Sequence, residues 1–121
     1  MTDSKLQIKL LSSLEKVFAD GAPCGSTWDR GSMLCNEVYC FQAAYTWTEP
    51  MEKNVRVHIN SALSSAISVN QVGLVPSEMP CYWDHDDNVL RTVPGLYPDI
   101  LLPMDEEGVP LLPEQWRALW V

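Results

Sequence analysis

The sequence lacks several features that would each indicate a particular class of protein. No apolar run approaches the ~18 residues of a membrane-spanning helix, and the first residues show neither the apolar core nor the cleavage site of a secretory signal. The six glycines are scattered, so a glycine-rich phosphate loop is absent as well. We therefore expect a cytoplasmic protein without a cofactor.

Basic residues are also scarce. Eight Lys and Arg stand against sixteen Asp and Glu, which gives a formal net charge of −8. Between residues 78 and 107 the only base is Arg91, and the acids are Glu78, Asp84, Asp86, Asp87, Asp99, Asp105, Glu106 and Glu107. With no basic stripe to neutralise phosphates, nucleic-acid binding is disfavoured.

Metal-binding patterns are weak. The four cysteines are Cys24, Cys35, Cys40 and Cys81, and no pair has C-x-x-C spacing. Without an export signal, we expect them to be thiols rather than disulfides. The segment 83–88 places Asp84, Asp86 and Asn88 as in a calcium loop, but Val89 and Gly95 occupy positions that need Gly and Glu. We expect a solvated acidic loop there.

The sequence indicates a single domain, residues 1–121, in which 46% of residues are hydrophobic. Short runs of alternating apolar and polar residues, divided by turn-forming segments, predict an all-β fold: an antiparallel β-sandwich of immunoglobulin or jelly-roll type. Residues 11–18 allow at most one or two helical turns. The predicted strands cover residues 6–10, 32–35, 37–46, 55–60, 67–75 with a bulge between Val69 and Val72, and 115–121.

After Pro80, prolines and acids predict a long loop instead of sheet. Its most constrained part is the segment 94–103, PGLYPDILLP, which suits contact with a neighbouring domain. We expect Asp99 to be a turn or capping carboxylate. Because nothing follows Val121, we expect the N-terminal domain of a longer protein, with its last strand or strands truncated and an unpaired strand edge that recruits a second copy.

No catalytic residue is predicted, since neither histidine has a recognisable nucleophile beside it. Trp116 and Trp120 are expected in the core. For the loop aromatics, packing against the loop itself and contact with a partner or ligand are equally open. The candidates for ligand or interdomain contact are Trp83, Asp84, His85, Tyr97 and Asp99.

Three motifs carry a family resemblance over most of the chain. Glu37, Phe41 and Gln42 form a Glu-x-x-x-Phe-Gln pattern. A Pro-Asp-x-Leu-x-Pro pattern and a final Leu-Trp-Val follow, carried by Pro98, Asp99, Leu101, Pro103, Leu119, Trp120 and Val121. This series resembles the N-terminal β-sandwich domain of proteins related to glycoside hydrolase family 123, the β-N-acetylgalactosaminidases.

The resemblance implies a non-catalytic accessory domain that buttresses a downstream (β/α) barrel. In that family the Asp-Glu pair of substrate-assisted hydrolysis lies in the barrel, so no position here carries it over. Two alternatives remain open. One is a carbohydrate-binding module with Trp83 and Tyr97 as its stacking platform, and the other is a free-standing protein-interaction domain.

Overall fold

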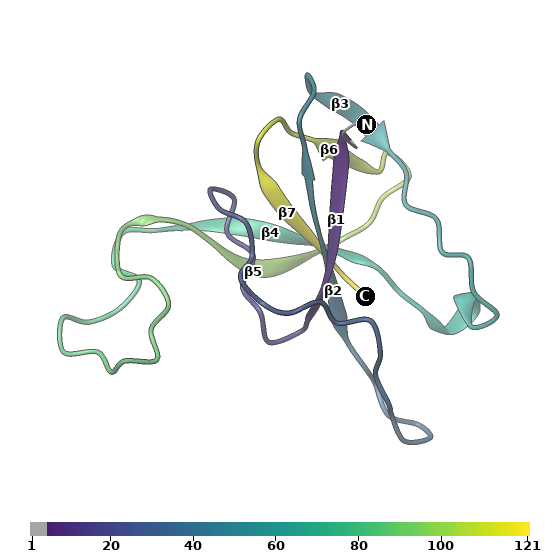
Figure 1. Cartoon of the computed structure of the whole chain (residues 1–121), viewed down its shortest axis with the longest axis horizontal. Helices are drawn as coiled ribbons and strands as arrows, with labels where there is room; N and C mark the ends of the chain where they lie inside the picture. The colour runs from purple at the N-terminus through teal and green to yellow at the C-terminus, as the bar shows by residue number, and fades with distance from the viewer. Residues whose placement is uncertain (1–4) are drawn as a thin grey trace.

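The computed structural model describes residues 5–121 and is built from β-strands (Figure 1). The elements in chain order are β1 (Leu6–Ser12), β2 (Phe41–Trp47), β3 (Glu52–Val55), the 3-10 turn η1 (Ser64–Ala66), β4 (Asn70–Ser77), β5 (Gly95–Pro103), β6 (Val109–Leu111) and β7 (Trp116–Trp120). They form a five-stranded sheet, β1-β2-β7-β4-β5, and a two-stranded ribbon, β3-β6. Neighbouring strands pair antiparallel, which confirms the predicted all-β class.

The large sheet has an apolar cluster on each face, because successive residues of a strand point to opposite sides. Ala44 of β2 pairs with Ala118 of β7, and both belong to a cluster with Leu11, Val17 and Val72. The opposite face contributes Tyr45 and Leu119, which pack with Val109 and Leu111 of the ribbon. The ribbon therefore covers one face, and residues following β1 cover the other.

Gln42 fixes the chain where it leaves β1. Its side chain is only 3% exposed, and its Nε2 lies 3.1 Å from the carbonyl of Ser12, 3.3 Å from that of Ser13 and 2.7 Å from that of Glu15. One amide group is thus shared by three partly buried carbonyls at the end of β1. The contact brings Val17 under the sheet.

Two predicted strands are wrong. Residues 32–35 are not in a strand, and β2 begins only at Phe41. The segment 55–60 is also outside the sheets beyond Val55, although Val57 and Ile59 alternate as in a strand. The strand partner decides this, because β6 has three residues and pairs only with β3. Residues 11–18 contain no helix.

The prediction of a long loop after Pro80 is wrong for the second half of that segment. Residues 95–103 form β5, the edge strand beside β4, and residues 109–111 form β6. Proline is tolerated at a sheet edge because a missing N–H there breaks no ladder hydrogen bond. The true loop is the connection 78–94, which extends far from the sheets (Figure 1).

The predicted bulge lies a little further along the chain than expected. Val72 pairs with Leu101 and Leu74 with Pro98, so Gly73 faces two residues of β5, Asp99 and Ile100. The final strand also departs from expectation, since β7 lies inside the sheet between β2 and β4. The edges of the sheet are β1 and β5.

Candidate functional site

A groove of about 560 Å³ opens where the connection 78–94 meets the sheet. Its walls come from residues 16–18, the end of β4, residues 88–91 and β5. Tyr97 and Asp99 line it, so the structure brings two of the five sequence candidates together. Lys16 and Arg91 add positive charge to walls that are otherwise mostly apolar.

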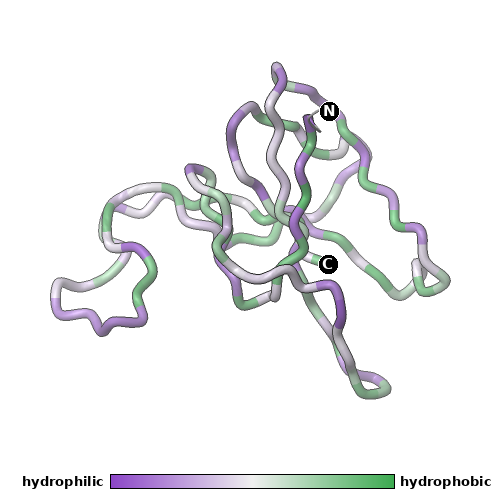
Figure 2. The backbone as a smooth tube through the Cα atoms, viewed as in Figure 1, coloured by the Kyte–Doolittle hydropathy of each residue, from purple (hydrophilic) through white to green (hydrophobic). Residues whose placement is uncertain are grey.

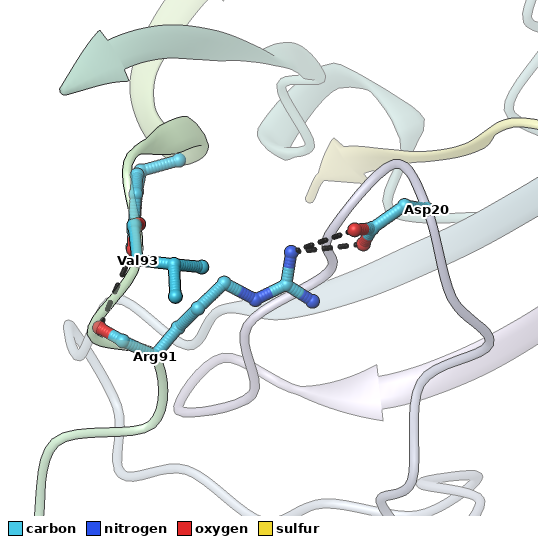
Figure 3. A network of polar contacts seen from close by, with 4 residues as sticks. Asp20, Arg91 and Val93 are labelled. Carbon is cyan, nitrogen blue, oxygen red and sulfur yellow. Dashed lines mark hydrogen bonds and ion pairs between the residues drawn. The ribbon is translucent and has the colours of Figure 1, made fainter. Parts of the chain in front are cut away.

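Arg91 anchors the connection at this groove (Figure 3). Its Nη1 donates to both carboxylate oxygens of Asp20, at 2.9 and 3.0 Å, and its guanidinium lies 3.7 Å from the centre of the Phe18 ring. The ion pair is exposed on the Asp20 side and contributes about 0–1 kcal/mol, and the cation–π contact about 0.5–1 kcal/mol. Together they tie two connections that are 71 residues apart in sequence.

Tyr97 completes the anchor from the sheet. Its ring meets Phe18 edge-on, with centroids 5.7 Å apart and planes at 82°. The hydroxyl donates to the carbonyl of Val93 and also lies 3.3 Å from that of Arg91. Tyr97 thus packs on Phe18 and bonds to two carbonyls of its own loop, and contact with a partner or ligand stays a prediction.

Asp99 occupies the bulge of β5 and is exposed. Within residues 5–121 its carboxylate accepts no hydrogen bond, so the expected turn or capping role is wrong. It lines the groove and an adjoining depression of about 190 Å³, as Lys16 does. Asp99 therefore places an unpaired negative charge on the rim of the groove.

The other three candidates, Trp83, Asp84 and His85, lie on the connection 78–94 away from the groove and are exposed. Trp83 is 93% exposed and, with His85, lines a separate depression of about 510 Å³. The backbone is shaped by local turn bonds, as expected for an acidic loop: Asp86 Oδ1 accepts from the N–H of Asn88 at 2.9 Å. Figure 2 shows that this end of the loop is hydrophilic.

Trp83 and Tyr97 thus line different depressions. No cluster of three or more His, Cys, Asp or Glu suited to a metal ion occurs within residues 5–121. The four cysteines are unpaired. Among the described residues, no helix has the length and apolarity needed to cross a membrane.

Sequence reasoning missed Phe18 and Asp20. Neither stands in a motif, and only the fold brings them to Arg91. A scan of protein families and a search of curated proteins find no match for this chain. The groove and the exposed surfaces around it are therefore the basis for assigning a function.

Proposed function

We propose that this chain is a non-catalytic accessory domain of a glycoside hydrolase-like protein, placed before a (β/α) barrel and packed against it. In this proposal the large sheet and the β3-β6 ribbon are the two layers of a β-sandwich. Each motif behind the family resemblance has a residue on a strand of one sheet, Gln42 on β2, Asp99 on β5 and Trp120 on β7, whereas Glu37 precedes β2 and Val121 follows β7. Gln42 and Trp120 are paired directly across β2 and β7.

The observation that carries the proposal is the apolar surface of the edge strand β5. Leu96 is 50% exposed and Ile100 48%, and the same strand exposes Leu101 and Leu102. These four large apolar side chains lie along one edge strand, with Leu101 and Leu102 on its opposite faces, and exceed the single scattered residues normal for a solvated surface. A neighbouring protein surface that covered them would remove this apolar area from water.

The edge is suited to contact through side chains rather than through added strands. Pro98 and Pro103 lack N–H groups, and the bulge at Asp99 and Ile100 interrupts the regular spacing of the edge. At the opposite edge, β1 carries Lys9, with Lys5 just before it. Both edges thus have features that oppose strand addition, which weakens the expectation of a dimer formed through an open edge.

The surroundings of β5 are also held in place. Arg91, Phe18 and Tyr97 fix the base of the connection 78–94 beside this strand. A surface that is already ordered loses less conformational entropy when a partner binds. The ordered surroundings of β5 therefore favour a domain that packs as a rigid body over a segment that folds on binding.

The first test is the coding sequence around this chain. We expect it to encode a (β/α) barrel with an adjacent Asp-Glu pair, and a neighbourhood without such a barrel would overturn the proposal. The isolated chain should release no nitrophenol from nitrophenyl N-acetyl-β-galactosaminide. Hydrolysis by the chain alone would contradict a non-catalytic role.

The second test measures binding between this chain and that barrel by isothermal titration calorimetry. Leu101→Asp places a charge within the apolar surface and should weaken binding by about tenfold or more. Leu63→Asp is the matched control, because Leu63 is the same residue type and is also exposed, at 68% against 44% for Leu101, but lies beside η1. Equal affinities of the two variants would exclude β5 as the contact surface.

A carbohydrate-binding module is the second candidate, favoured by the exposure of Trp83. The face of an indole ring can stack on a sugar ring. In this candidate Trp83 stacks alone, without the contribution of Tyr97 that the sequence suggested. Titration with N-acetylgalactosamine and galactose, followed by the indole NMR signal of Trp83, tests it directly. The third candidate, a free-standing interaction domain, would be favoured if the chain bound a protein other than a barrel.

A further inference from the structure

The depression beside Trp83 is a second surface, distinct from the groove and from β5. It is lined by Met79, Cys81, Tyr82, Trp83, His85 and Thr92 and has a volume of about 510 Å³. We call it the tip depression. Trp83 is 93% and Tyr82 76% exposed, so two adjacent aromatic rings lie open to water. Aromatic rings contribute strongly to binding when a partner covers them.

The charge around the tip depression is negative. Glu78, Asp84, Asp86 and Asp87 are exposed, and none forms an ion pair within residues 5–121. Arg91, the only Lys or Arg of the connection 78–94, is bound to Asp20 at the groove. The field at the tip is therefore left without local compensation, which disfavours acidic partners and attracts cationic ones.

We propose that the tip depression receives a lysine or arginine side chain presented by a partner protein. The cation lies against the rings of Trp83 and Tyr82, and the negative charge of Asp84, Asp86 and Asp87 on the same segment attracts it. Aromatic faces and carboxylates both favour the binding of a cation. The binding of a neutral sugar would gain little from the negative charge. The inference rests on the proposed function in one respect, because the barrel domain is the expected source of this basic surface.

The anchor explains how such a tip could act at a distance from the sheet. The connection 78–94 leaves β4 and returns to β5, and its base is held by Arg91 and Tyr97. Local bonds at Asp86 hold the backbone of the tip. The aromatic rings and the aspartates are therefore carried on one anchored segment.

The test uses the intact chain with tetra-arginine and tetralysine as probes, tetraglutamate as the charge-reversed control and N-acetylgalactosamine as the sugar arm. The readout is the indole N–H signal of Trp83 in a 1H–15N spectrum, assigned by its loss in Trp83→Phe. We expect the basic peptides to shift this signal and tetraglutamate to leave it unchanged. Added salt should weaken the response.

A variant carrying Asp84→Asn, Asp86→Asn and Asp87→Asn loses the charge, while the new amide oxygen at residue 86 can still accept from the N–H of Asn88. We expect its affinity for tetra-arginine to fall about tenfold. Glu106→Gln with Glu107→Gln is the matched control, since these exposed acids lie on a different connection, between β5 and β6. That control should bind tetra-arginine as the unmodified chain does.

Three results would overturn the inference: no shift at millimolar basic peptide, an equal loss of affinity in the Glu106 and Glu107 control, or a response to the sugar that survives the Asn substitutions. The last result would assign the depression to carbohydrate. None of them bears on the β5 surface, which the Leu101→Asp titration reports separately. If the barrel binds and the triple Asn variant binds it equally well, the accessory function stands and the tip inference fails.

Discussion

The guanidinium of Arg91 lies 3.7 Å from the centre of the Phe18 ring, and the same group holds the carboxylate of Asp20. The contact joins the connection that follows β1 to the one that precedes β5. Phe18 also meets Tyr97 edge-on, so one aromatic ring links Arg91 to the sheet. This small set of contacts positions both the groove and the base of the long loop.

Arg91→Ala should release the base of the connection 78–94. Loss of the ion pair and the cation–π contact together should lower the free energy of unfolding by about 1 kcal/mol, because both contacts are partly solvated. Faster amide exchange in residues 88–93, with β2 and β7 unchanged, is the sharper measurement. Arg91→Lys keeps a cation near Phe18 and should be intermediate. Unchanged exchange in Arg91→Ala would show that the anchor does not order the loop.

Gly73→Ala should strain the bulge between β4 and β5. A Cβ at residue 73 would lie 2.5 Å from Cγ2 of Ile100, so the isoleucine would have to move. We expect a loss of about 1–3 kcal/mol in the free energy of unfolding, measured by denaturant titration. Gly21→Ala, where nothing lies within 4 Å, is the control. Adding Ile100→Ala should restore part of the loss, and failure to do so would place the strain elsewhere.

Gln42→Ala should loosen the end of β1. The carbonyls of Ser12, Ser13 and Glu15 would lose their shared donor, at a cost of about 1–3 kcal/mol. Thermal and urea unfolding measure this directly. Gln7→Ala removes an exposed amide from the same sheet and should change stability little. Equal effects of the two substitutions would contradict the role assigned to Gln42.

Tyr45 should make the protein sensitive to alkaline pH. Burial raises the pKa of its phenol above 10.0, and the nearby charge of Arg117 only partly opposes this. Above pH 10 the unfolded chain releases the phenolic proton while the folded chain keeps it. The free energy of unfolding should therefore be unaffected by Tyr45 below pH 10 and should fall as pH rises towards the folded pKa.

Tyr45→Phe is the matching variant for this alkaline effect. It should remove the additional loss of stability above pH 10, measured by urea titration at several pH values. The Tyr45 hydroxyl and Arg117 Nε are both buried without a hydrogen-bond partner within residues 5–121, so the substitution should cost little at neutral pH. An identical pH profile for the variant and the unmodified chain would assign the alkaline effect to other groups.

Part of this architecture could be predicted from the sequence. Alternation at Leu6, Ile8 and Leu10 correctly placed β1, and the final aromatic run correctly placed β7. The same reasoning was wrong at Val57 and Ile59, whose pattern is equally regular, because no strand lies beside them to pair with. The local alternation of apolar and polar residues indicates that the backbone tends to be extended, whereas a β-strand also requires a neighbouring strand to pair with.

The candidate site was predicted less well, for a related reason. Tyr97 and Asp99 stood out within a proline-rich segment, but prolines suggested a loop where the chain forms an edge strand. Phe18 and Asp20 gave no signal, since their roles depend on meeting Arg91 from a distant part of the chain. The sequence suggested that Trp83 and Tyr97 form one stacking platform, but in the structure they line separate depressions.

The sequence by itself determined an all-β chain with an excess of acids and no pattern of catalytic or metal-binding residues, because composition and alternation are local properties. Only the tertiary structure decided which extended segments became strands, which of them formed the edges, and which side chains met in the groove. Those outcomes depend on pairing between segments far apart in the chain. They made β5 an exposed apolar edge and placed Trp83 on an anchored acidic loop.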